Sequence, residues 1–170
     1  MSRAALKGHL VLSTLHTNDA ISAVPRLTDL GIPPYLLSSS LLGLSAPRLA
    51  RRLCPICTTE HTPTPEEWDA LGGAPANASV TLYQAVGCQA CGQKGYSGRI
   101  SLAEIIRIDA GLQRRIDDHQ PTSKLKRYLK EQGVTLMRQD GLMKAQAGLT
   151  SVEEVGRVVQ LEVGEALGDA

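Results

Sequence analysis

Two pairs of closely spaced cysteines constrain the fold of this chain more than any other feature. The first pair is Cys54-Pro-Ile-Cys57 and the second is Cys88-Gln-Ala-Cys91. Four thiolates on two such turns suit the tetrahedral coordination of zinc, and Gly92 suits a close approach of the backbone at the second turn. Because four protein ligands leave no position for water, the pattern predicts a structural zinc ion. The alternative is that the thiols are simply buried or remain from a lost site.

The segment that carries these cysteines, residues 54–91, is rich in Thr, Pro, Gly and Ala and has too few apolar residues for a core of its own. Zinc binding supplies roughly 10 to 16 kcal/mol of folding free energy to zinc-finger peptides. We therefore expect chelation to unfold this segment. Paired cysteines in a chain without an export signal also favour metal binding in a reducing compartment over disulfide formation.

The composition argues against nucleic-acid and membrane-spanning roles. Lysine and arginine number 18 against 17 aspartates and glutamates, and aromatic residues make up 3% of the chain. The chain therefore offers neither a strongly basic surface nor many side chains on which bases can stack. No apolar run approaches the roughly 20 residues that span a bilayer, and the first residues are too polar for a signal peptide. We expect a cytoplasmic protein with no transmembrane segment and no nucleic-acid partner.

Residues 9–15 (HLVLSTL) form a short apolar run, which is typical of a parallel strand covered on both faces. Residues 17–19 are N-cap types, and apolar residues then recur at helical spacing from Ala20 until Gly31. Together these patterns predict half of a βαβ unit, and we expect the partners of such a strand to lie upstream. Pro25 falls inside the predicted helix, where a proline costs about 3 kcal/mol.

The remaining patterns predict two more strands and a series of helices. The strands are expected at residues 48–53 and 99–108, and a short helix at 65–71 lies within the cysteine-bearing segment. Further helices are expected at residues 35–44, 110–119, 123–132, 137–147 and 151–161. The last of these opens with a capping box, in which Thr150 or Ser151 pairs with the acidic residue three positions later.

A second informative motif is GHLVLSTLHTNDA at residues 8–20. It resembles the His box of the secretion-superfamily ATPases, which drive type II secretion and type IV pilus assembly. The similarity continues through LLSSSLLG at 36–43, RLARRLC at 48–54, GYSGR at 95–99 with Glu104, and MRQDG at 137–141. Five matches in the family's order, interleaved with the four cysteines, make the chain similar to the C-terminal portion of such an ATPase.

This resemblance implies an α/β fold in which part of a RecA-like P-loop ATPase domain carries an inserted four-cysteine zinc module and a C-terminal helical subdomain. The expected boundaries are 1–53 for the ATPase-domain part, 54–98 for the zinc module, 99–161 for the return strand and helical subdomain, and 162–170 for a frayed tail. The resemblance also implies a hexamer of homologous ATPase subunits. Such a hexamer works with inner-membrane secretion or pilus platform proteins and is peripheral to the inner membrane.

In this family the His box lies beside the bound nucleotide. The resemblance therefore makes His16 and His9 candidate catalytic residues and implies that Thr14 and Thr17 lie near the nucleotide. His16 is the stronger candidate because it follows the C-terminal end of the predicted strand, where ligands of α/β proteins collect. A donor there stabilises the charge that develops on a transferred phosphoryl group. The alternative is that either histidine only caps a helix or hydrogen-bonds in the core.

Three arginines of the predicted strand at 48–53 form another group of candidate residues. Arg48, Arg51 and Arg52 either face a neighbouring subunit or form a solvated strand edge. The sequence leaves both interpretations open, because charged residues are common on exposed strand edges whether or not a partner binds there.

The groups that hold ATP phosphates and magnesium are missing from these residues. No GxxxxGK[ST] loop occurs in the sequence, and no acidic pair ends a strand before the His box. In the family both lie upstream, so we expect ATP and Mg2+ to be cofactors of the complete protein only, and no hydrolysis by this chain alone. The alternative functions are a zinc-ribbon adaptor or regulator that binds an intact homologous ATPase, and a non-functional truncated gene product.

Overall fold

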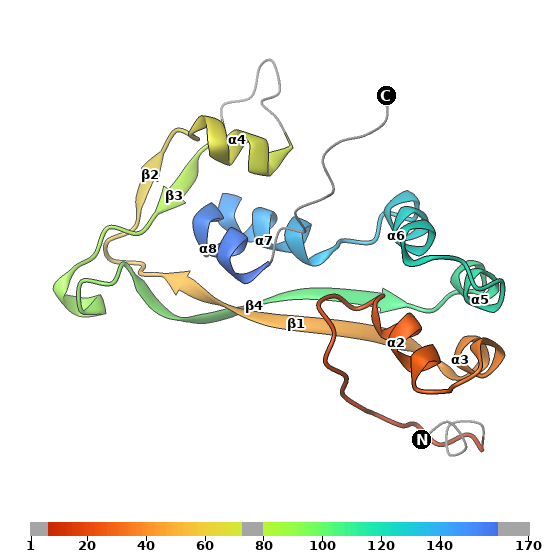
Figure 1. Ribbon diagram of the computed structural model, residues 1–170. Helices are drawn as coiled ribbons and strands as arrows, with labels where there is room; N and C mark the ends of the chain where they lie inside the picture. Colours follow the sequence, from red (N-terminus) through yellow and green to blue (C-terminus); the bar gives the residue numbers. More distant parts are fainter. Residues whose placement is uncertain (1–6, 73–79, 160–170) are drawn as a thin grey trace. The chain divides into compact units, whose positions relative to one another are not determined.

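A computed structural model describes residues 7–72 and 80–159 of the chain (Figure 1). The chain divides into two compact units, one of residues 1–46 and 103–136 and the other of residues 47–102 and 137–170. The long strands β1 (Gly43–Leu53) and β4 (Tyr96–Arg107) pair with each other, and each runs from one unit into the other. Helices and strands occur in both units, which confirms the prediction of a mixed α/β chain.

The first unit is built mainly from helices. It contains α2 (Ala23–Asp29), α3 (Pro34–Ser40), α5 (Ala110–Asp117) and α6 (Thr122–Glu131). Helix α3 packs against both α2 and α5, and α5 packs against α6. The buried side chains of its core are all aliphatic, in keeping with the absence of Phe from the sequence: Ala20, Ile21, Val24, Leu37, Ile106, Ile108, Leu112, Ile116, Leu125 and Leu129.

The second unit joins a small hairpin to two helices. It contains β2 (Thr59–His61), α4 (Pro65–Leu71), β3 (Leu82–Gln84), the 3₁₀ turn η1 (Gln89–Cys91), α7 (Met137–Gln146) and α8 (Val152–Val158). Strands β2 and β3 pair antiparallel, and α7 packs against both α8 and β3. Helices α7 and α8 approach closely at Gly141, where a Cβ atom would lie 2.7 Å from the Val155 side chain.

The predicted strand at residues 9–15 is wrong. Residues 9–17 form neither helix nor strand, and the side chains of Leu10 and Leu12 are 76% and 89% exposed. A parallel strand takes its backbone hydrogen bonds from neighbouring strands, and no strand in the described part of the chain pairs with this segment. Leu10 and Leu12 are therefore open to solvent, and Val11 and Leu15 only partly buried, where the pattern of the run predicts burial.

The helix that follows begins later than predicted. Helix α2 starts at Ala23, after a turn in which the Ser22 N–H donates to the Asp19 carboxylate at 2.8 Å. Pro25 is thus in the first turn of the helix and not in its interior. Because the N–H groups of a first turn have no acceptor within the helix, the expected cost of about 3 kcal/mol does not apply.

The predicted helix at 35–44 ends early, as α3 stops at Ser40. The hydroxyl groups of Ser39 and Ser40 donate to the backbone carbonyls of Tyr35 and Leu36, respectively. Such bonds compete with the helical hydrogen-bond pattern. The chain turns extended at Leu41, and β1 begins at Gly43 and includes the whole of the strand predicted at 48–53.

The other predicted elements are confirmed, with small shifts at their ends. Helix α4 has the predicted bounds and begins with a capping box between Thr64 and Glu67. Strand β4 and helices α5 to α8 lie where the sequence patterns predict them. Helix α8 ends at Val158, and residues 160–161 of the predicted helix and the predicted tail at 162–170 lie outside the described residues. None of the helices described at 7–72 and 80–159 is long and apolar enough to cross a membrane.

Candidate metal centre

The four cysteines come together from two separate parts of the second unit. Cys54 directly follows β1 and Cys57 ends the turn after it, while Cys88 precedes η1 and Cys91 ends it. All four sulfur atoms lie within 4.8 Å of one another. Cys57 Sγ and Cys88 Sγ are each 3.8 Å from Cys91 Sγ, far longer than the roughly 2.05 Å of a disulfide bond. These thiols are therefore free to act as metal ligands.

The distances between the sulfur atoms fit tetrahedral coordination. A Zn–S bond is about 2.3 Å long, so a regular tetrahedron of four thiolates has sulfur atoms about 3.8 Å apart. This is the separation of Cys91 Sγ from Cys57 Sγ and Cys88 Sγ. Soft thiolates favour zinc over magnesium or calcium, which prefer oxygen ligands. The cysteines can therefore hold one metal ion, and their arrangement suits a zinc ion with a complete set of protein ligands.

Backbone amides favour the thiolate form of Cys91. The N–H of Cys88 and the N–H of Gly95 each donate to Cys91 Sγ at 3.2 Å. The hydrogen bond from Cys88 makes the larger contribution, and together these bonds lower the pKa of Cys91 to about 6. Because thiolates and not thiols bind metals, Cys91 is ready to act as a ligand at neutral pH.

In the absence of a bound cation, Cys57 favours the thiol form, unlike Cys91. Burial raises the pKa of the Cys57 thiol to about 12, which favours the protonated form. A bound divalent cation reverses this preference, because thiols that coordinate it are deprotonated outright. Metal binding at this site should therefore release protons.

The predicted close approach at Gly92 is wrong. Gly92 has a φ of 60°, and a Cβ atom there would meet nothing within 4 Å. Glycine is favoured at this position by its left-handed backbone conformation. The close approach lies at Gly95 instead, where a Cβ atom would be 2.5 Å from the Cβ of Ala85.

The His-box residues belong to the first unit. His9, Thr14 and His16 are exposed and Thr17 is partly buried, all on the irregular segment at 9–17. The two histidines are therefore accessible to a ligand, and neither is held in the core of the unit. Their approach to a nucleotide stays a prediction.

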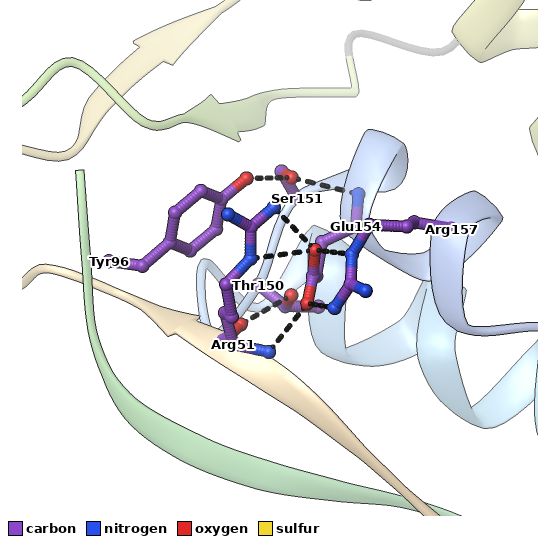
Figure 2. Close-up of polar contacts among 6 residues, drawn as sticks. All are labelled: Arg51, Tyr96, Thr150, Ser151, Glu154 and Arg157. Atoms are coloured by element: carbon purple, nitrogen blue, oxygen red, sulfur yellow. Dashed lines mark hydrogen bonds and ion pairs between the residues drawn. The ribbon is translucent and has the colours of Figure 1, made fainter. Parts of the chain in front are cut away.

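Of the three candidate arginines, Arg51 makes the contacts drawn in Figure 2. Its Nε and Nη2 atoms donate to Glu154 at 2.9 and 2.6 Å, and its backbone N–H donates to the same carboxylate at 2.8 Å. The guanidinium also lies 4.1 Å from the centre of the Tyr96 ring. Arg48 and Arg52 are exposed. The Arg51 side chain is thus engaged within its own unit, and a subunit-interface role for the three stays a prediction.

Glu154 is a structural residue that the sequence only partly revealed. Its side chain is fully buried, and Arg157 donates to it from Nε and Nη2 at 2.7 and 2.6 Å. Burial raises the pKa of Glu154, but the hydrogen bonds from Arg157 and Arg51 outweigh burial and lower the pKa to about 2. The Ser151 hydroxyl accepts the Glu154 N–H at 3.1 Å, which confirms one half of the predicted capping box.

The other half of that box is replaced by the contacts with the arginines. The spacing of Glu154 and Arg157, three residues apart on a helix, was a signal for an ion pair. No local pattern pointed to Arg51, because it is distant in the sequence and reaches the carboxylate only through the fold.

Comparison with known proteins gives one consistent result. A model of the family described as "Type II/IV secretion system protein" matches residues 1–157. The chain is 45% identical over 160 residues to the type II secretion system protein E of Pseudomonas aeruginosa, covering 94% of this chain and 32% of that protein. It is 42% identical over 158 residues to the type II secretion system ATPase E of Vibrio cholerae, covering 93% of this chain and 31% of the relative.

A further relative comes from pilus assembly. The chain is 39% identical over 155 residues to the type IV pilus assembly ATPase PilB of Thermus thermophilus, covering 91% of this chain and 17% of that protein. The chain therefore spans about a third or less of the length of these three relatives. Because the family model covers most of the sequence and the relatives are similar along nearly all of it, the chain belongs to the type II/IV secretion system protein family.

Proposed function

We propose that this chain is the C-terminal portion of a hexameric ATPase that powers type II protein secretion or type IV pilus assembly. The observation that carries the proposal is the family match over residues 1–157, together with relatives that are named as secretion and pilus ATPases. Within that protein, residues 1–53 belong to a RecA-like nucleotide domain, 54–98 form the zinc module, and 99–161 return to a helical subdomain.

The role of the cysteines in this proposal is to hold structural zinc. The sulfur atoms of Cys54, Cys57, Cys88 and Cys91 lie within 4.8 Å of one another. Together they would fill all four positions of a tetrahedral zinc ion and leave none for substrate or water. Zinc at this point ties the end of β1 to the loop before β4. Its contribution is therefore to the folding of residues 54–98 and not to the chemistry of ATP.

The role of the His box is to approach the bound nucleotide. His16 and His9, with Thr14 and Thr17 beside them, lie on a segment that is open in this chain. A hydrogen-bond donor such as His16 near the terminal phosphate stabilises negative charge that develops during phosphoryl transfer. The phosphate-binding loop and the ligands of Mg2+ come from the remainder of the complete protein, so this chain alone hydrolyses no ATP.

The proposed assembly is a ring of homologous subunits at the cytoplasmic face of the inner membrane, where it drives platform proteins of the secretion or pilus machine. Arg48 and Arg52 remain candidates for contact with a neighbouring subunit, because both are exposed on β1. The sequence identities to secretion and to pilus relatives are similar, so they do not favour one machine over the other.

A chimera tests this proposal. The matched 160 residues of the Pseudomonas aeruginosa type II secretion system protein E are replaced with this chain, and ATP hydrolysis is measured alongside secretion in cells that lack the native protein. We expect the chimera to hydrolyse ATP and restore secretion, while the isolated chain does neither. His16→Ala in the chimera should lower kcat by about 100- to 1,000-fold, as loss of a charge-stabilising donor does elsewhere.

Ser13→Ala is the matched control, since Ser13 is a small, exposed residue of the same segment. It should leave kcat unchanged. A chimera that folds and binds ATP but does not hydrolyse it contradicts the proposed function. A chimera that is active with His16→Ala contradicts only the role of that histidine.

A further inference from the structure

The second cysteine pair lies in a loop, residues 85–95, whose two ends touch each other. At Gly87, which has a φ of 107°, a Cβ atom would lie 2.8 Å from the carbonyl oxygen of Gln93. At Gly95, which has a φ of 72°, a Cβ atom would lie 2.5 Å from the Cβ of Ala85 and 3.0 Å from its backbone. The backbone at Gly87 and Gly95 therefore packs so closely against the rest of the loop that neither position has room for a side chain.

Gly95 also connects the two halves of the metal centre. Its N–H donates to Cys91 Sγ at 3.2 Å, and its carbonyl oxygen accepts the N–H of Cys54 at 2.9 Å. Cys91 belongs to the second cysteine pair and Cys54 to the first. One buried residue thus bonds to both pairs through its backbone alone.

The backbone conformation of Gly95 sets the directions of these two bonds. The N–H and the carbonyl group of one residue belong to two different peptide planes, and φ and ψ determine the angle between those planes. A positive φ costs an L-residue about 1 to 2 kcal/mol, so a side chain at this position favours a rotation that turns the donor away from the acceptor. Contact between such a side chain and Ala85 favours the same rotation.

We propose that Gly95 is a positioning residue of the metal centre. It holds the thiolate of Cys91 and the turn that carries Cys54 at the positions needed to bind the same ion. This inference rests on the proposed metal site. Gly95 directly precedes β4 and Cys54 directly follows β1, so the same contact ties the metal centre to the ends of both strands. It gives a physical reason for a glycine at the start of the GYSGR motif, which the metal ligands by themselves do not explain.

The test compares metal binding by Gly95→Ala and the unchanged chain. Zinc affinity is measured by competition with a chromophoric chelator, and the absorption spectrum of the Co2+-loaded protein reports on the geometry of the four thiolates. Loss of a residue that orients a metal ligand usually weakens binding by about 10- to 100-fold, and we expect a loss of this size for Gly95→Ala. The charge-transfer and d–d bands of Co2+ should also shift.

Gly98→Ala is the matched control. Gly98 lies in β4 with a φ of 78°, and a Cβ atom there would meet nothing within 4 Å. This variant pays a similar backbone cost without the contact with Ala85, so its zinc affinity and Co2+ spectrum should match those of the unchanged chain. Equal affinities and spectra for Gly95→Ala and Gly98→Ala would overturn the inference.

Two further results keep the test decisive. If Gly95→Ala does not fold, the double variant Gly95→Ala/Ala85→Gly, which removes the nearest contact, is compared with Gly98→Ala. Zinc binding at least tenfold weaker than in Gly98→Ala supports the inference, and equal binding overturns it.

If the unchanged chain takes up no zinc or Co2+, the proposed metal role itself is wrong. If the unchanged chain binds one ion and the glycine variants do not differ, only the role of Gly95 is wrong.

Discussion

Among the described residues, Glu154 is a buried carboxylate whose ionisation is closely tied to folding. Its side chain is fully buried, whereas those of its partners Arg51 and Arg157 are 44% and 58% exposed. The pKa of Glu154 in the folded state, about 2, lies below its ordinary value of 4.5. The stabilisation is therefore complete above pH 4.5 and is lost as the pH falls from about 4.5 towards 2.

We expect Glu154→Gln to lower the free energy of unfolding by about 3 kcal/mol at pH 7. A shift in the pKa of Glu154 from 4.5 to about 2 corresponds to a stabilisation of this size. Urea unfolding at a series of pH values measures both the loss and its pH dependence. The variant should lose less stability than the unchanged chain between pH 4.5 and 2. Glu153→Gln, on the exposed side of the same helix, is the control and should change stability by less than about 0.5 kcal/mol. An unchanged acid dependence in Glu154→Gln would contradict the assignment.

At the scale of secondary-structure elements, the start of α2 decides the effect of Pro25. A proline in the interior of a helix costs about 3 kcal/mol, but Pro25 occupies the first turn, after the N-cap Ser22. Proline at a compatible position also stabilises a protein modestly by restricting the unfolded chain. We therefore expect Pro25→Ala to change the free energy of unfolding by less than about 1 kcal/mol. A gain approaching 3 kcal/mol in urea unfolding would show that the proline strains the helix.

The hairpin of β2 and β3 gives a physical reason to expect that a metal stabilises the cysteine-bearing segment. Each strand has three paired residues, and a two-stranded hairpin of this kind is marginally stable in water by itself. Among the residues described between the two cysteine pairs, the buried apolar side chains are those of Pro63 and Leu82. A bound ion that joins Cys54 and Cys57 to Cys88 and Cys91 closes both ends of this segment.

At the scale of the whole molecule, the two units should respond differently to chelation. The first unit has an aliphatic core of its own, whereas we expect residues 54–98 of the second to depend on a metal held by the four cysteines. After zinc is removed, hydrogen exchange should accelerate by orders of magnitude at β2 and β3, while the buried turns of α5 and α6 keep their protection. Protein treated with zinc-saturated chelator is the control. Unchanged exchange at β2 and β3 in zinc-free protein would contradict a folding role for the ion.

Local sequence patterns predicted the helices and strands whose start and stop signals lie within a few residues of the element itself. The helix at 65–71 was predicted to the residue, since Pro65 and Gly72 mark its ends and the Thr64–Glu67 box caps it. The four C-terminal helices were also predicted, with small shifts at their ends. The strand at 9–15 was not borne out, because burial of an apolar run depends on partner strands that no pattern in the run itself can supply.

The sequence by itself determined the family, most of the helices and the four cysteines that can hold a metal, because each of these depends on residue types at short, regular spacings. Only the tertiary structure decided which backbone groups hold the thiolates, that Gly95 and not Gly92 is closely packed, and that Arg51 pairs with Glu154. These contacts join residues that are distant along the chain or depend on the sign of a backbone angle. Neither a distance in space nor such an angle is encoded in the spacing of residues, so both arise only when the chain folds.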